Sequence, residues 1–404
     1  MKRIAPLTFL LVALALPGHQ ASGQSDRAEV QTTVLISRAR DGGLPNGPST
    51  NAVISNDRRW ARVIAYQSDA SNLVAGDRNG LTDVFVVRRA GRFGNLGTTW
   101  SRGGTRLVSR ARGGRAANGR SWAPAVDGAL YETPRCVAFL SSASNLVRGD
   151  TNRHVDAFVA SLRTRGVRRV SLPRGRQAHA DSTQVAISGD CSRIAFVAAG
   201  VVWVRVHGRT VRAGRGTEPS FSTGVRNDLV YGGPRGVYLS KSGTARPRLV
   251  APGGRDPAFN DVKRRVVAYE KRVAGHWQVM WRDVGRRERA ASARYGSLGN
   301  GDSRDPVIGN SGYYIAFESE ASNLGVNALS RRGDYNSRPD AYLYTGVRDL
   351  TLVQSVREKA VPLWGGGRHP SMSFYANYIL FDSPAPLGSR DGPEQIWMRY
   401  LGGI

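Results

Sequence analysis

The chain has 404 residues, of which 40% are hydrophobic and 48 are glycine, so it can bury a large core and form many tight turns. Lys and Arg outnumber Asp and Glu by 58 to 31, which gives a formal net charge of +27 at pH 7. Apolar runs are short and Val is frequent. No long segment has the apolar period of a helix, which excludes a helical bundle and indicates an all-β protein.

The first 23 residues predict an export signal. They begin with Met-Lys-Arg, continue with an apolar stretch over 4–16, and end on the small residues Ala21-Ser22-Gly23. The apolar stretch is shorter than the ~20 residues that a membrane-spanning helix needs, and no later segment predicts a transmembrane span. We therefore expect a signal peptide at 1–23, a short linker at 24–31, and a protein that is secreted or held in the periplasm or cell envelope.

After the linker, a phrase of sequence recurs three times, over 55–86, 137–159 and 315–343. Each copy has an apolar strand ending in Ala-aromatic, then S-x-A-S-N-L, then G-D-x-N-x-x-x-D, then a second apolar strand. Weaker copies of the strand pattern occupy 185–206, 219–240, 257–284 and 370–401.

Each unit predicts four strands, and seven aromatic residues mark the second strand of the units. These markers are Tyr66, Phe139, Phe196, Tyr231, Tyr269, Phe317 and Phe381. A four-stranded sheet is unstable alone, whereas packing such sheets radially buries both faces of each one. We therefore expect a single all-β domain over 32–404, a β-propeller of seven four-stranded blades, with six blades as the alternative.

The two ends of the domain predict how the ring closes. Segment 32–38 resembles the short basic-apolar strands that lie between successive units. The last unit ends at 395–401 without such a strand after it. The N-terminal strand is therefore expected to supply the outer strand of the final blade.

The repeat resembles the TolB-like (WD-type) β-propeller repeat of bacterial envelope proteins. The resemblance rests on Ser55, Asp57, Arg59, Ala65, Tyr66, Ala70 to Val74, Asp77, Asn79, Asp83 and Phe85. It implies the propeller fold and the envelope compartment, and it implies little about activity. TolB-like proteins also have an N-terminal α/β domain, for which there is no room between Gly23 and Thr32, so we expect that domain to be lacking.

The G-D-x-N-x-x-x-D loops are candidate Ca²⁺ sites, because closely spaced oxygen side chains suit a hard cation. The candidate ligands are Asp77, Asn79, Asp83, Asp150, Asn152, Asp156, Asp334, Asn336 and Asp340. No Glu closes the loops as in an EF-hand, and Arg78, Arg153 and Arg338 add positive charge. The alternative, which we favour, is that Asp and Asn bond nearby backbone groups and hold a hairpin.

The chain has two cysteines, Cys136 and Cys191. In an oxidising compartment they are candidates for a disulfide, with two buried free thiols as the alternative.

Motifs for catalysis are missing from the sequence. There is no G-x-S-x-G elbow and no H-E-x-x-H pair, and a glycosidase would need two carboxylates that converge in space. Trp122 and Trp364 are candidates for a binding surface. We predict no catalytic residues and no cofactor other than the Ca²⁺ above, and expect a non-enzymatic binding scaffold. The alternative is a glycan-acting hydrolase or lyase with a carboxylate site at the propeller channel.

The charge suggests the kind of partner. Arginine forms forked contacts with phosphate and carboxylate, so an anionic envelope polymer fits, as does a protein; the alternative is that the arginine excess reflects coding bias on a solvated surface. Nucleic acid is disfavoured by the export signal and by the lack of a recognition module. We expect a monomer.

Overall fold

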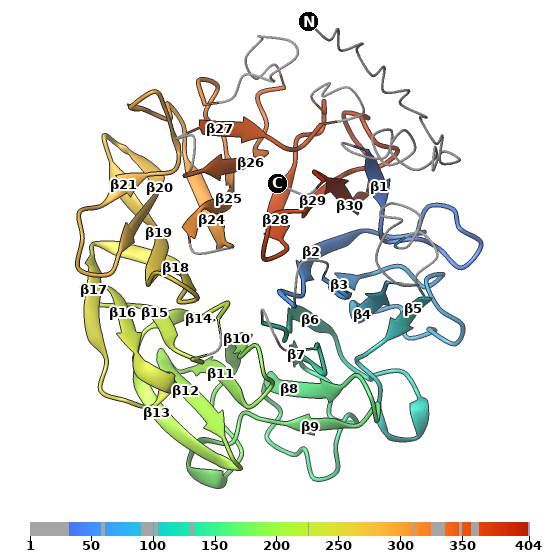
Figure 1. The fold of residues 1–404 in the computed structure, drawn as a ribbon. Helices are drawn as coiled ribbons and strands as arrows, with labels where there is room; N and C mark the ends of the chain where they lie inside the picture. The colour runs from blue at the N-terminus through green and yellow to red at the C-terminus, as the bar shows by residue number, and fades with distance from the viewer. Residues whose placement is uncertain are drawn as a thin grey trace, which may run out of the picture.

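The computed structural model describes residues 32–402 except 58–60, 90–99, 101–103, 130–132, 225, 310–311, 325–335, 347–349 and 357–362. Within these residues the chain forms seven four-stranded antiparallel sheets, arranged as blades around a central axis (Figure 1). The predicted all-β fold with seven blades is confirmed. The predicted signal peptide and linker, and Asp334, lie outside the described residues.

In blades 1 to 6 the four strands follow one another in chain order from the innermost to the outermost. Blades 1 to 3 consist of β2 (Ser49–Ile54), β3 (Val63–Ser68), β4 (Asp83–Arg88) and β5 (Gly104–Leu107); β6 (Ser121–Val126), β7 (Cys136–Ser141), β8 (Asp156–Ser161) and β9 (Val167–Arg169); and β10 (Ser182–Ile187), β11 (Arg193–Ala198), β12 (Val201–Val206) and β13 (Arg209–Arg215). Blades 4 to 6 consist of β14 (Thr217–Phe221), β15 (Leu229–Gly233), β16 (Gly236–Ser240) and β17 (Arg248–Pro252); β18 (Gly254–Asn260), β19 (Val266–Val273), β20 (His276–Asp283) and β21 (Arg289–Ala290); and β24 (Ser303–Ile308), β25 (Tyr314–Ser319), β26 (Asp340–Thr345) and β27 (Leu350–Val353).

Blade 7 consists of β28 (Arg368–Met372), β29 (Tyr378–Pro384), β30 (Glu394–Tyr400) and β1 (Thr33–Leu35). A small hairpin and three short 3₁₀ turns complete the described elements: β22 (Ala293–Arg294), β23 (Ser297–Leu298), η1 (Arg112–Gly114), η2 (Pro173–Gly175) and η3 (Lys241–Gly243).

The N-terminal strand closes the ring, as predicted. Strand β1 pairs antiparallel with β30, with Thr33 opposite Arg399, and in Figure 1 it lies directly beside β30. Just beyond β1, the Ser37 hydroxyl donates to Gln395 Oε1 at 2.8 Å. Segments from the two ends of the domain therefore share one sheet, so the last blade is complete only when both are in place.

The core lies between neighbouring blades. All seven aromatic markers fall on the second strand of a blade and are at most 1% exposed. Tyr66 stacks on Phe85 within blade 1 and belongs to the same buried cluster as Tyr378 and Ile396 of blade 7. Each blade thus buries its faces against the two beside it, and the apolar area removed from water there is the main stabilising contribution.

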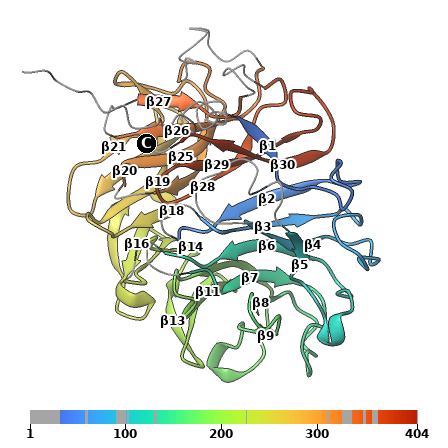
Figure 2. The same cartoon turned by 45° about the vertical axis from the view of Figure 1, so that its right-hand side comes forward.

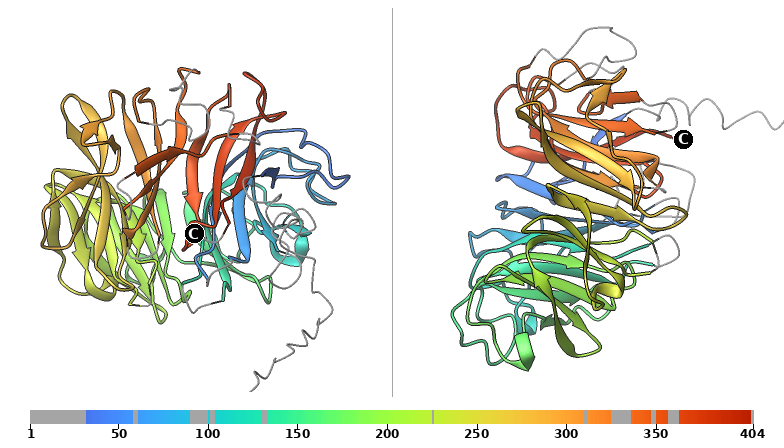
Figure 3. Two further views of the ribbon diagram at one scale, coloured as in Figure 1. Left: turned by 45° about the horizontal axis from the view of Figure 1, so that its top comes forward. Right: turned by 90° about the vertical axis from the view of Figure 1, so that its left-hand side faces the viewer.

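The repeated loops gather at one face of the ring. Each of these loops follows the second strand of its blade, in the β3–β4, β7–β8 and β25–β26 connections. The last residues of the second strand pair with the first residues of the innermost strand, as Gln67 pairs with Thr50. We call the face where the innermost strands begin the motif face. Figures 2 and 3 show the blades as twisted sheets side by side, with the connections at the two faces of the ring.

None of the described residues belongs to a helix long and apolar enough to cross a membrane.

Candidate functional site

The innermost strands begin with a shared backbone feature at the motif face. In six blades one residue near the start of the strand has a positive φ, and the pairing with the second strand shifts just after it, as in a β-bulge. These residues are Asn51 (φ 53°), Ala123 (51°), Glu218 (56°), Asp256 (44°), Asp305 (53°) and His369 (45°). All six, together with Gln184 of blade 3, line a cavity of about 570 Å³ bounded by all seven innermost strands. We call this cavity the channel.

The backbone N–H of each of these six residues donates a hydrogen bond to a side-chain oxygen of the preceding blade. The pairs are Asn51 with Asp382 (2.9 Å), Ala123 with Gln67 (2.9 Å), Glu218 with Gln184 (2.6 Å), Asp256 with Glu218 (2.6 Å), Asp305 with Glu270 (3.0 Å), and His369 with Glu318 (3.0 Å). A buried N–H left unpaired costs about 1–3 kcal/mol. These contacts therefore hold six of the seven blade junctions together at the channel.

The side chains around the channel divide by charge. Blades 4 to 7 supply six carboxylates, which we call the acidic crescent: Glu218, Asp256, Glu270, Asp305, Glu318 and Asp382. Blades 1 to 3 present neutral groups, including Asn51, Ala123 and Gln184. The channel is therefore acidic on one side only.

Three carboxylates of the crescent lie close together: oxygens of Asp256, Glu270 and Asp305 are all within 4.8 Å of one another. Glu270 is 3% exposed, and its two oxygens accept from the Asp305 backbone and from Arg255 Nε at 2.9 Å. Burial, followed by the negative charges of Asp305, Glu270 and Glu218, raises the pKa of Asp256 well above its ordinary value. Burial and the charge of Glu318 raise the pKa of Asp305 to about 6. Such a group can bind a cation, or can hold and release a proton near neutral pH.

At the end of the crescent, His369 Nδ1 lies 2.8 Å from Asp382 Oδ2. The hydrogen bond that His369 donates to Asp382, together with the charge of Asp382, raises the pKa of His369 to about 9, while burial raises the pKa of Asp382 to about 6. Between those values the pair is an imidazolium beside a carboxylate. Because Asp382 also accepts the Asn51 N–H, it positions both the histidine and the first blade.

An aromatic side chain borders the crescent at blades 5 and 6. The guanidinium of Arg255 lies 3.4 Å from the centre of the Trp277 ring, and that of Arg304 lies 5.9 Å from it. Each arginine directly precedes a channel aspartate in its strand. Of the tryptophans singled out from the sequence, Trp122 lines the channel, whereas Trp364 is 58% exposed.

The predicted Ca²⁺ residues lie in the repeated loops and not in the channel. Asn79 Nδ2 donates to Asp83 Oδ2 at 2.6 Å and to the Ala117 carbonyl at 3.2 Å, and the Ser109 hydroxyl donates to Asp83 Oδ1. The same contacts recur for Asn152, Asp156, Ser171 and for Asn336, Asp340, Ser355. Asp150 pairs with Arg169 at 2.9 Å, and Asp77 is 7% exposed. These hydrogen bonds support the hairpin-holding interpretation, and Ca²⁺ binding stays a prediction.

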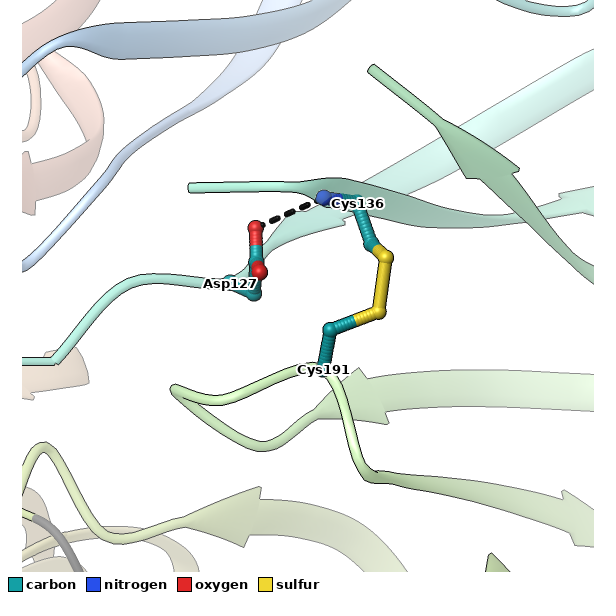
Figure 4. Close-up of side chains that lie close together, drawn as sticks. All are labelled: Asp127, Cys136 and Cys191. Atoms are coloured by element: carbon teal, nitrogen blue, oxygen red, sulfur yellow. Dashed lines mark hydrogen bonds between the residues drawn. A yellow bond between two sulfur atoms is a disulfide. The ribbon is translucent and has the colours of Figure 1, made fainter. Parts of the chain in front are cut away.

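Cys136 and Cys191 are joined as a disulfide in the structure (Figure 4). It links the start of β7 in blade 2 to the β10–β11 turn of blade 3, and Asp127 accepts the Cys136 N–H at 2.9 Å. In blade 2, Leu140 stands where Gln67 stands in blade 1, so this junction lacks a side-chain acceptor at that position. The disulfide therefore joins the two neighbouring blades that are not linked at the channel by a hydrogen bond from a backbone N–H to a side chain of the preceding blade.

The sequence contained a signal for the crescent that motif reasoning missed. The positive-φ residue is followed by proline in five blades, giving Ala123-Pro124, Glu218-Pro219, Asp256-Pro257, Asp305-Pro306 and His369-Pro370. Aligning the units on this proline places the three acidic residues at one position of successive blades.

The fold and the channel define a seven-bladed β-propeller. No protein-family model matches the chain, and neither does the sequence of any curated protein. Similar solved structures include the β-propeller domain of the Trilobed protease from Pyrococcus furiosus, with a TM-score of 0.52, 9% identity, and coverage of 88% of this chain and 94% of that chain.

Oligogalacturonate lyase in complex with manganese matches with a TM-score of 0.51 and 10% identity over 92% of this chain and 98% of that chain. A structure from a study of two prolyl endopeptidases matches with a TM-score of 0.51 and 10% identity, and the match covers 90% of this chain and 50% of that chain. At these identities the likeness shows the fold alone. The TolB-like resemblance stays a prediction.

Proposed function

We propose that the protein is an exported binding propeller whose channel takes a basic segment of a partner protein through the acidic crescent. The observation that carries the proposal is the one-sided group of carboxylates, of which Glu218, Asp256 and Asp305 line the channel itself, in a chain whose formal net charge is +27. Carboxylates gathered at one point repel one another, and strongly perturbed ionisable groups in a cleft are typical of functional sites. The export signal predicted at 1–23 supports the compartment.

Blade construction accounts for only part of the crescent. Glu218, Glu270, Glu318 and Asp382 each accept a backbone N–H of the next blade. Asp256 and Asp305 accept no backbone N–H from the described residues, and Asn51 and Ala123 at the equivalent positions indicate that the bulge needs no acid. The carboxylates of Asp256 and Asp305 are therefore the ones to assign to a ligand.

The channel suits one cationic side chain with its neighbouring backbone. A cavity of about 570 Å³ is within the range of ordinary ligand sites. An ammonium or guanidinium group placed between Asp256 and Asp305 would relieve their repulsion, and the neutral side, with Asn51 and Gln184, offers amide groups to a peptide backbone.

The test is the double variant D256N/D305N. Asparagine tolerates a positive φ and already occupies this position in blade 1 as Asn51, so the ring is expected to form. We expect a Lys/Arg-rich peptide to bind the protein in calorimetric titration and to bind D256N/D305N at least about tenfold more weakly, because each close charge pair contributes about 1.5 kcal/mol or more. The control D69N/E320Q removes two exposed acids and should leave the affinity within twofold. Equal loss in both variants, or in neither, would contradict the proposal.

A second candidate is a glycan-acting hydrolase or lyase. It is favoured by the pKa of Asp305, raised to about 6 beside Glu270, since an acid and a base in close proximity are what glycoside cleavage requires. Release of reducing ends or unsaturated products from polysaccharides, abolished by D305N, would identify this activity instead. The absence of such release with peptide binding intact would leave the binding function.

A further inference from the structure

Four arginines lie together where blades 1 and 2 meet at the outer edge of the ring. Arg88 is the last residue of β4, Arg106 is in β5, Arg110 follows β5, and Arg165 is in the turn between β8 and β9. Arg106, Arg110 and Arg165 line one recess between the two blades. We call these four residues the arginine seam.

The arginine seam has no acidic partner among the described residues. Arg106 is fixed across the seam by donating from Nη2 to the Leu162 carbonyl at 3.1 Å, and Arg88 and Arg165 are exposed. Elsewhere, arginines that build the fold are paired, as Arg169 is with Asp150 and Arg265 with Asp228, both at 2.9 Å. The four positive charges of the seam are therefore not explained by ion pairs within the described part of the chain.

The positive charges of the arginine seam repel one another, and this repulsion affects the pKa of Arg106. Burial, and then the like charges of Arg165, Arg88 and Arg110, lower the pKa of Arg106. An anion bound at the surface of the arginine seam would offset the like-charge part of this penalty, and the guanidinium fork suits phosphate and carboxylate groups.

Positive charge continues at the next blade junction. Arg168 on β9 and Arg205 on β12 are close enough that burial and the charge of Arg168 lower the pKa of Arg205. Arg165 and Arg168 belong to the same β8–β9 hairpin, so the seam is linked to this pair across blade 2. A single small anion would contact either the arginine seam or the Arg168–Arg205 pair, whereas a long chain of anionic groups would contact both.

We propose that the outer edge of blades 1 to 3 binds a soluble polymer with regularly spaced phosphate or carboxylate groups, and that the arginine seam is its main contact. The site is separate from the channel and goes beyond the function proposed above. A lipid surface fits less well, because none of the large apolar side chains exposed in the described part of the chain lies in the seam; they are Leu44, Val211, Tyr295 and Trp364.

The experiment measures binding of labelled polyphosphate and polygalacturonate by fluorescence anisotropy at several salt concentrations. The variant R88Q/R165Q removes only exposed charges, and the matched control R272Q/R287Q removes two exposed arginines of blade 5. We expect R88Q/R165Q to bind at least about tenfold more weakly, with the slope of log K against log salt reduced by about 1.5, because each neutralised contact contributes about 0.7–0.9 to that slope. The control should change the affinity less than twofold.

Three further arms decide the source of the anion and the independence of the site. The channel variant D256N/D305N should keep full polymer binding, so that failure of one site is distinguishable from failure of the other. Inorganic phosphate should compete only at concentrations far above the polymer's phosphate content, since it meets one contact at a time. The proposal is overturned if R88Q/R165Q and R272Q/R287Q weaken binding equally, if phosphate alone binds as tightly as the polymer, or if anionic vesicles bind through Arg88 and Arg165 while the polymers do not.

Discussion

Asp256 and Asp305 place carboxyl groups where the backbone requires only a residue that tolerates a positive φ. Such a conformation costs a non-glycine residue about 1 kcal/mol, and Asn and Asp tolerate it best. The backbone N–H of each is satisfied by the preceding blade, so the conformation is held from outside the residue. The carboxylates themselves add repulsion, which indicates that stability has been given up at this point of the molecule.

We predict that D305N stabilises the protein at pH 8. The pKa of Asp305 is raised from 3.8 to about 6 in the folded state, so its contribution to stability is fully present below pH 3.8 and is lost as the pH rises through 6. Because one pKa unit corresponds to about 1.4 kcal/mol and Asp305 is partly exposed, we expect a gain of about 1 kcal/mol in the free energy of unfolding. Urea denaturation at pH 8 and pH 4.5 measures it. The gain should be much smaller at pH 4.5, because the folded-state carboxyl is protonated there, and it should vanish below pH 3.8. A gain of the same size at pH 8 and pH 4.5 would mean that the charge is not its cause.

At the scale of the element, the repeated loop connects its own hairpin to the next blade. Asp83 is fully buried at the start of β4, where its oxygens accept from Asn79 and Ser109. Asn79 also donates to the Ala117 carbonyl, which lies just before β6 of blade 2. One asparagine thus holds a hairpin and the approach to the following blade, which explains why three blades share the motif.

We predict that N79A lowers the free energy of unfolding by about 1–3 kcal/mol, because it removes the amide that satisfies a buried carboxylate oxygen and a backbone carbonyl. The matched control is N72A: Asn72 is in the same loop but bonds the backbone N–H of Asn46 at an exposed position, so a smaller loss is expected. EDTA should leave the melting temperature of the wild type unchanged. A lower melting temperature in EDTA, reversed by Ca²⁺, would show instead that a cation holds the loop.

At the scale of the whole molecule, the ring is closed by different means at different junctions. Six junctions are bracketed at the channel by a side chain that accepts a backbone N–H of the next blade, and β1 completes blade 7. The junction of blades 2 and 3 has the disulfide. Since every blade buries its faces against two others, weakening one junction exposes core on both sides of it.

We predict that C136S/C191S lowers the free energy of unfolding by about 2–4 kcal/mol, because the disulfide closes a loop of 55 residues and limits the freedom of the unfolded chain. Thermal unfolding of the variant, and of the wild type with and without a reductant, measures the effect. The reduced wild type should behave like the variant. No difference between oxidised and reduced protein would contradict a stabilising disulfide at this junction.

The blade count and the closure were predictable because they depend on local sequence. Tyr66 and its six counterparts recur at the same position of the second strand in each unit. The second strand of a blade is buried on both faces, so it consists mainly of apolar residues and is recognisable from the sequence. The partner of β1 was predictable because the last unit has no outer strand of its own. The histidine of the channel was not predicted, since the feature that distinguishes His369 from the other histidines, the following Pro370, becomes informative only when the units are aligned on that proline.

The sequence by itself determined the fold class, seven repeated units and the source of the closing strand, since each of these follows from short-range pattern and from counting. Only the tertiary structure decided which charges meet. Asn51 and His369 are 318 positions apart in numbering and line the same channel only because the ring closes. For the same reason Arg106 and Arg165 form one seam, and Asp256, Glu270 and Asp305 come within 4.8 Å of one another. Electrostatic interaction depends on distance in space, which the order of residues along the chain does not specify.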